Sequence, residues 1–191
     1  MQSISGDGKQ AIEMAVHTLD EGGVVMHPTE TCYGLAVDIF NENSLSKLYH
    51  IKDMRKTKPV SILVDSLEMA QDYGHFSEKA LELAVKHWPG PLSIVVPRKD
   101  TLPDFLNPGM KFVSIRCSSL KFCRDMVEKF SQPVTTTSAN VSGQPPLYRP
   151  EKLGGVDLLI NVGEVPGNKP STIVRVNGDK VEVLREGDVL I

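Results

Sequence analysis

The chain has 191 residues, of which 40% are hydrophobic and 24% are charged, and its formal net charge is −3. These values lie near the averages of globular proteins, so they exclude a disordered chain. The small acidic surplus also argues against a protein that coats nucleic acid, although it leaves room for a local basic cleft.

The first half of the chain alternates between helical and extended patterns. Apolar residues recur at helical spacing from Ile12 to Leu19, with Asp7 as the expected cap and Gly22-Gly23 as the expected end. Buried or extended strands are expected at 24–27, 34–40 and 60–64, and helices at 44–51 and 66–73.

The second half continues the alternation. A helix is expected to begin at Ser77-Glu78, to carry a stripe of Leu81, Ala84, Val85 and Trp88, and to end at Pro89-Gly90. Strands are expected at 92–96, 112–116, 133–137, 156–161 and 172–176, with a helix at 120–130. Asn177-Gly178 between alternating segments predicts a hairpin. One α/β domain with a mixed sheet follows, over residues 1–191.

Several kinds of chemistry have no support in the sequence. The three cysteines form no C-x-x-C pair, the histidines form no metal-ligand pair, and no G-x-S-x-G turn is present. Cys32 has no activating neighbour in the sequence, so we expect a packed thiol rather than a nucleophile. No signal peptide or membrane span is evident, and we expect a cytoplasmic protein.

Three polar loops lie beside expected strands. They are "HPTETCYG" (27–34), the basic "IKDMRKTKP" (51–59) and "TTTSANVSGQPP" (135–146). Taken alone, each has an ordinary explanation as a solvated loop or turn. Together they supply the cations, hydroxyls and amides that bind a nucleotide triphosphate, and loops at strand ends are where ligands usually bind.

The same loops resemble a known family. "HPTETCYGLAVD" resembles the P-T-[DE]-T-x-Y-G-L-x-x-D signature of the YrdC-like threonylcarbamoyl-adenylate synthases. "HWPGPLSIVV", "TTSANVSGQPP" and "KPSTIVRV…VEVLREG" are similar to later segments of that family, in the same order. The resemblance covers about residues 10–190 and implies a twisted open mixed sheet flanked by helices, with a concave basic cleft.

The resemblance also implies a reaction. L-threonine, bicarbonate and ATP would give threonylcarbamoyl-AMP and pyrophosphate, for threonylcarbamoyladenosine modification of tRNA. Mg²⁺ is expected with ATP, held mostly through water, so that no protein ligand can be named. Expected partners are the downstream tRNA threonylcarbamoyl transferase machinery and, weakly, tRNA itself. The short chain is similar to the single-domain members of the family.

Residue roles follow from the matched motifs. Thr31, Arg116 and Ser171 would bind threonine, with Arg116 as a bidentate fork for its carboxylate. The ATP site would be lined by Lys52, Arg55, Lys58, Thr136, Ser138, Asn140 and Arg185. Lys52 and Arg55 are the expected catalytic residues, acting through positioning and charge neutralisation.

One departure from the family pattern concerns the basic loop. The family has K-x-R followed by K-P, and alignment on Lys52 and Lys58-Pro59 puts Met54 at the arginine position. We expect Arg55, one residue later, to take that role, since a lysine cannot copy the planar fork of an arginine. The alternatives are that Lys56 compensates or that this site is weakened. The alternative function is a non-catalytic RNA- or nucleotide-binding relative that uses the same basic cleft.

Overall fold

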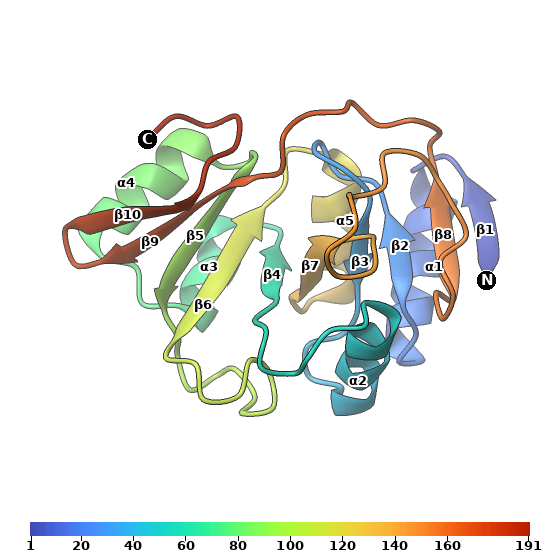
Figure 1. Cartoon of the computed structure of the whole chain (residues 1–191), viewed down its shortest axis with the longest axis horizontal. Coiled ribbons are helices and arrows are strands. Elements are labelled where there is room, and N and C mark those ends of the chain that lie inside the picture. The colour runs from blue at the N-terminus through green and yellow to red at the C-terminus, as the bar shows by residue number, and fades with distance from the viewer.

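The computed structural model describes residues 1–191, which form ten strands and five helices (Figure 1). The strands are β1 (Gln2–Ser5), β2 (Val25–His27), β3 (Gly34–Ala36), β4 (Ser61–Val64), β5 (Leu92–Pro97), β6 (Phe112–Cys117), β7 (Val134–Ser138), β8 (Leu158–Asn161), β9 (Thr172–Asn177) and β10 (Lys180–Arg185). The helices are α1 (Lys9–Asp20), α2 (Glu42–Ile51), α3 (Leu67–Tyr73), α4 (Glu78–His87) and α5 (Lys121–Phe130).

All ten strands belong to one open mixed sheet, in the order β1-β8-β2-β3-β7-β4-β6-β5-β9-β10. The pairs β1–β8, β2–β8, β4–β6 and β5–β9 are parallel, and the other neighbours are antiparallel. The β9–β10 hairpin turns at Asn177 and Gly178, and Gly178 has a φ of 59° that suits glycine. The predicted hairpin and the predicted α/β class with a mixed sheet are confirmed.

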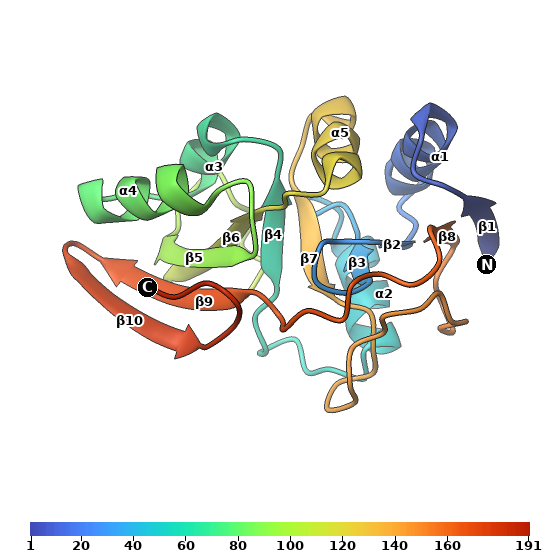
Figure 2. The same ribbon diagram turned by 90° about the horizontal axis from the view of Figure 1, so that it is seen from above.

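The helices cover the two faces of the sheet unequally. Figure 2 shows α1, α3, α4 and α5 along one side of the molecule and α2 on the other. Because the sheet is twisted, the faces divide differently: α2, α3 and α4 pack on the face of Leu35 and Ile62, and α1 and α5 on the opposite face. Buried residues of α1 and α5, among them Ala15 and Met126, pack on strand residues such as Val25 and Val134. Burying these apolar side chains is the main source of stability for such a layer. No helix of the chain is long and apolar enough to cross a membrane.

Two local predictions need correction, and one strand has no counterpart among the predictions. Helix α1 is capped by Gly8, which makes no side-chain cap bond, rather than by Asp7. In α4 the buried residues are Ala80, Leu83 and Ala84, whereas Val85 is 72% exposed. Strand β1 was not expected, because its residues are mostly exposed and polar and give no apolar pattern. It forms as an edge strand through parallel pairing with β8.

Candidate functional site

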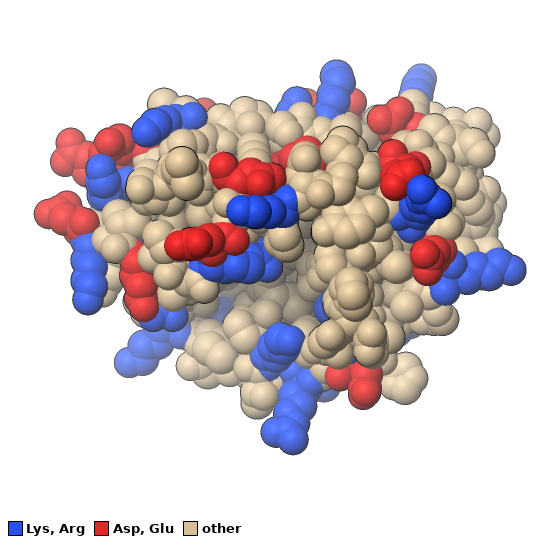
Figure 3. All heavy atoms as spheres, turned by 45° about the horizontal axis from the view of Figure 1, so that its top comes forward, with Lys and Arg blue, Asp and Glu red and all other residues tan.

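A cleft of about 450 Å³ is lined by residues of the neighbouring strands β4, β5, β6, β7 and β9 and of the loops beside them. Figure 3 shows the molecule hollowed at its centre, with basic side chains at the border of the hollow. Four of the 24 lining residues are cationic, and none is acidic. The cations are Lys52, Lys58, Arg116 and Arg185. Such a lining attracts anions and gives an acidic ligand no carboxylate to repel it.

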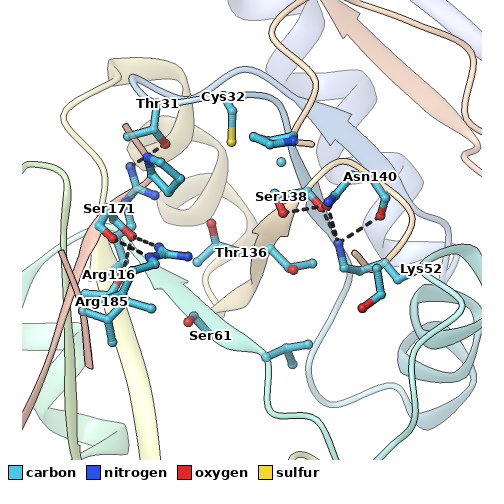
Figure 4. Close-up of a pocket in the computed structure, with 18 of the residues that line it drawn as sticks. Thr31, Cys32, Lys52, Ser61, Arg116, Thr136, Ser138, Asn140, Ser171 and Arg185 are labelled. Carbon is cyan, nitrogen blue, oxygen red and sulfur yellow. Dashed lines mark hydrogen bonds between the residues drawn. The ribbon is translucent and has the colours of Figure 1, made fainter. Parts of the chain in front are cut away.

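One end of the cleft, which we call the lysine end, consists of Lys52, Lys58, Ser138, Asn140 and Ser142. Lys52 is the cap residue of α2, and its buried ammonium donates to Ser138 O (2.5 Å), Asn140 O (3.1 Å) and Asn140 Oδ1 (2.9 Å). An ammonium has three donors, so these three acceptors account for all of them. Lys52 therefore holds the loop after β7 against the end of α2 (Figure 4).

Two further bonds join the same two loops. Ser142 N donates to Lys52 O (2.7 Å), and Lys58 Nζ donates to Ser142 Oγ (2.9 Å). Burial, assisted by the positive charge of Lys58, lowers the pKa of Lys52 from 10.5 to about 8. Neither lysine is in an ion pair with a carboxylate. The positive charge at the lysine end is thus uncompensated by the protein.

The opposite end, which we call the arginine end, consists of Thr31, Ser93, Arg116, Ser171 and Arg185. Arg185, at the end of β10, donates from Nε to Ser171 O and from Nη2 to Ser171 Oγ, both at 2.9 Å. The Ser171 and Ser93 hydroxyls lie 3.0 Å apart, both buried. Burial and the nearby charge of Arg116 lower the pKa of Arg185. Figure 4 shows these side chains facing Lys52 and Asn140 across Ser61 and Thr136.

Arg116 comes from β6 and is buried, yet it lines the cleft. Its Nη2 donates to Thr31 Oγ1 (3.2 Å) and pairs with Glu30 Oε1 (2.9 Å), while its Nε is buried without a partner. A buried donor without a partner costs about 1–3 kcal/mol. The residue nevertheless lines the cleft, and its guanidinium charge acts there. The arginine end is therefore prepared for an anionic group.

Glu30 is a site residue that sequence reasoning missed. Its carboxylate accepts from the Ser118 hydroxyl and from Ser119 N (3.3 Å) besides pairing with Arg116. Burial opposes ionisation, but the Arg116 charge and these hydrogen bonds outweigh it and lower the pKa of Glu30. The acidic position in "PTET" was a signal, but its partner lies 86 residues away along the chain.

The structure brings nine of the ten predicted site residues to the cleft. Arg55 is the exception, because it is exposed, makes no side-chain hydrogen bond and does not line the cleft, whereas Met54 does. Arg185 lies at the arginine end, beside the residues predicted for threonine rather than beside Lys52. Cys32 lines the cleft as a buried thiol, and burial raises its pKa, which does not favour a nucleophile.

The cleft offers no carboxylate set for a metal ion. No acidic residue lines it, and no group of three or more His, Cys, Asp or Glu in the structure could hold a metal. The residues thus do not form a Mg²⁺ site of their own. That Mg²⁺ accompanies a nucleotide stays a prediction.

Comparison with known families decides the classification. The model of the Sua5, YciO and YrdC family, described as "Telomere recombination", matches residues 17–187. The chain belongs to this family. A member from Methanocaldococcus jannaschii is 31% identical over 188 residues, covering 96% of this chain and 88% of that one. The threonylcarbamoyl-AMP synthase of Vibrio parahaemolyticus is 30% identical over 183 residues, which are 92% of this chain and 98% of that protein.

Solved structures of the Sua5, YciO and YrdC family share the fold. Pyrococcus abyssi Sua5 complexed with L-threonine superposes with a TM-score of 0.90 at 26% identity, over 97% of this chain. This chain spans 57% of that Sua5 chain. Escherichia coli YciO superposes with a TM-score of 0.87 over 98% of this chain at 22% identity, which supports the fold alone. The predicted open, helix-flanked sheet of the YrdC-like type is confirmed.

Proposed function

We propose that this chain is a threonylcarbamoyl-AMP synthase, which forms threonylcarbamoyl-AMP and pyrophosphate from L-threonine, bicarbonate and ATP. The observation that carries the proposal is the cleft itself. It is lined by cations and hydroxyls with no acidic residue, in a chain whose curated homologues are named threonylcarbamoyl-AMP synthases. As a transferase of a nucleotidyl group it would act in tRNA modification in the cytoplasm.

The arginine end suits the amino acid. Arg116 has a buried, unpartnered Nε and, with the Thr31 and Ser171 hydroxyls, would hold the carboxylate of threonine. The amine of threonine would then attack bicarbonate or carbon dioxide, giving a carbamate and releasing water or a proton. The P. abyssi Sua5 structure with L-threonine supports threonine as the amino acid.

The lysine end suits the phosphates of ATP. A carbamate oxygen would attack the α-phosphorus, and the bond from that phosphorus to the pyrophosphate oxygen would break. The protein's contribution is to fix the two reactants and to balance the charge on the phosphates. Lys58 lies at the surface, where it donates to the Ser142 hydroxyl, and it would turn toward the phosphates. Lys52 holds the segment that presents Ser138 and Asn140. Thr136 lies between the two ends.

The test is release of pyrophosphate by the purified protein with threonine, bicarbonate, ATP and Mg²⁺. We expect release to require threonine and bicarbonate, and to be faster with threonine than with serine. An Arg116→Ala variant prepared identically controls for contaminating ATPases. Release that does not depend on threonine, or that is equal in the variant, would contradict the proposal.

The same protein also tests the alternative of a non-catalytic RNA-binding relative. Tight, salt-sensitive tRNA binding without ATP binding would favour that function instead, because phosphate contacts release counterions. On our proposal, tRNA binding is weak and ATP binding is direct. The product is a reactive mixed anhydride, so a tRNA threonylcarbamoyl transferase is the expected recipient.

A further inference from the structure

The buried ion pair at the arginine end differs from the other ion pairs of the chain. The side chains of Arg116 and Glu30 are only 8% and 16% exposed, and their nitrogen and oxygen lie 2.9 Å apart. Elsewhere, at least one member of each pair is 48% exposed or more, as in Arg149–Glu164 at 69% and 59%. Surface pairs contribute little, whereas a buried pair fixes the geometry of both partners.

The carboxylate of Glu30 is itself held in place. One oxygen accepts from Arg116 and from Ser119 N, and the other accepts from the Ser118 hydroxyl, so the loop between β6 and α5 fixes its direction. Glu30 does not line the cleft. It can therefore act on a ligand only through Arg116.

The pair also sets how Arg116 can meet a ligand. Nη2 is occupied by Glu30 and Thr31, whereas Nε is buried and has no partner. A guanidinium tied at one corner cannot turn that corner into the cleft. Both two-bond faces of a guanidinium include Nη2, so this pairing leaves a ligand carboxylate single hydrogen bonds from the remaining N–H groups rather than a two-bond fork.

Charge separates the two ends of the cleft as well. Glu30 balances Arg116, and Arg185 has no carboxylate partner, so the arginine end has about one net positive charge. At the lysine end both cations are uncompensated. The single net positive charge of the arginine end suits the carboxylate of a zwitterionic amino acid, and the two uncompensated cations of the lysine end suit a polyphosphate.

We propose that Glu30 is a positioning residue, which orients Arg116 for the carboxylate of an α-amino acid and prevents phosphate groups from binding at the arginine end. This inference rests on the proposed function. Replacing Glu30 by glutamine would remove the carboxylate charge that holds Nη2 and leave Arg116 and Arg185 as two uncompensated cations. The amino-acid subsite would then lose its geometry and also accept anions of higher charge.

The experiment measures threonine and ATP separately on Glu30→Gln, Glu30→Asp and Glu164→Gln. Glu164→Gln is the matched control, since it removes one carboxylate of an exposed pair outside the cleft. For Glu30→Gln we expect the Kd and KM for threonine to rise at least tenfold, with the Kd for ATP changed less than threefold. Glu30→Asp should recover part of the loss, and Glu164→Gln should match the wild type.

Inhibition by pyrophosphate provides the second readout. It should compete with ATP in the wild type, and with both ATP and threonine in Glu30→Gln. A merely structural role would raise both Kd values together and leave the inhibition pattern unchanged, which would overturn the proposal.

Should Glu30→Gln fail to fold, Ser118→Ala loosens the same carboxylate and should raise the KM for threonine alone. If the wild type binds threonine and Glu30→Gln binds it equally well, the inference about Glu30 is refuted but the proposed function is not. If the wild type binds no threonine, the proposed function is refuted as well.

Discussion

The two ends of the cleft hold their cations by different means. At the arginine end, Arg116 and Arg185 come from strands and bond to neighbouring side chains and one carboxylate. At the lysine end, Lys52 bonds mainly to the backbone carbonyls of Ser138 at the end of β7 and of Asn140 in the following loop, and it makes no ion pair with a carboxylate. The positions of the cations at the arginine end are therefore fixed by strands of the sheet, and those at the lysine end by a contact between two loops. Mutations should therefore affect geometry at the first end and loop order at the second.

The largest effect is expected at the arginine end. Arg116→Ala leaves Glu30 buried without its partner, which typically costs about 3–5 kcal/mol. We expect kcat/KM for threonine to fall by ~10²-fold or more and the melting temperature to drop, measured by pyrophosphate release and thermal unfolding. Arg149→Ala, which breaks an exposed pair, is the control and should change neither. An unchanged KM for threonine in Arg116→Ala would break the distinction between the ends.

At the lysine end the expected loss is smaller and falls on ATP. Lys52→Met removes three charge-assisted bonds, one to the last residue of β7 and two to Asn140 in the loop after it, and the remaining acceptors can turn to water. We expect the KM for ATP to rise by ~10–100-fold, about 1.5–3 kcal/mol, with faster proteolysis at residues 139–146. Lys47→Met removes a lysine–carbonyl bond outside the cleft and should leave both unchanged. Equal loss of threonine and ATP affinity in Lys52→Met would mean that the ends are not separable.

A pH titration sharpens the same comparison. Lys52 has a pKa of about 8, so it is charged below that pH and neutral above it. The affinity for ATP should fall about tenfold, or ~1.4 kcal/mol, as pH rises through 8, and Lys52→Arg should flatten the profile. Threonine affinity that follows the same curve would contradict assignment of Lys52 to ATP.

The pH dependence of the contribution of Lys52 to folding stability has the opposite sign. Between pH of about 8 and 10.5 the unfolded state binds more protons than the folded state, so the contribution of Lys52 to the free energy of unfolding increases as pH rises.

The smallest effect is expected for Arg55. Because its side chain lies outside the cleft, Arg55→Ala should change the KM for ATP by less than threefold, under about 0.65 kcal/mol. Met54→Arg places a cation where Met54 lines the cleft, and it should lower that KM. Steady-state ATP titrations of both variants decide the matter. A loss of ~2–4 kcal/mol in transition-state stabilisation for Arg55→Ala would restore Arg55 as the substitute for the arginine of the K-x-R motif.

Much of the fold could be predicted because its strands are continuous apolar runs between clear turns. The buried strand β4 and the hairpin at Asn177-Gly178 have such patterns. Edge strand β1 lacks one, since its side chains face solvent and only pairing with β8 defines it. The face of α4 was misjudged because Leu81, Ala84, Val85 and Trp88 fit helical spacing as well as Ala80, Leu83 and Ala84 do. Helical spacing alone does not say which stripe meets the sheet.

Site residues could be predicted where a sequence motif fixes the residue type. They could not be predicted where a turn or a partner distant in the sequence determines which side chain reaches the site. Lys52, Arg116 and Asn140 line the cleft as expected. Asp53 has a φ of 46°, a left-handed conformation that reverses the chain after α2 and brings Met54 to the cleft while Arg55 is left exposed. Nothing in the sequence marks that turn. The Glu30–Arg116 pair likewise exists only once two distant loops have met.

Strand β7 lies between the two halves of the sheet, pairing with β3 over two residues and with β4 over three. Glu30 and Thr31 lie in the loop between β2 and β3, in the half formed by β1, β8, β2 and β3. Arg116 lies in β6, in the half formed by β4, β6, β5, β9 and β10. Their ion pair and hydrogen bond therefore connect the halves across the cleft, independently of β7. It follows that one pair of buried charges, together with the backbone pairing of β7, holds the curvature of the sheet and with it the separation between an amino acid and a nucleotide.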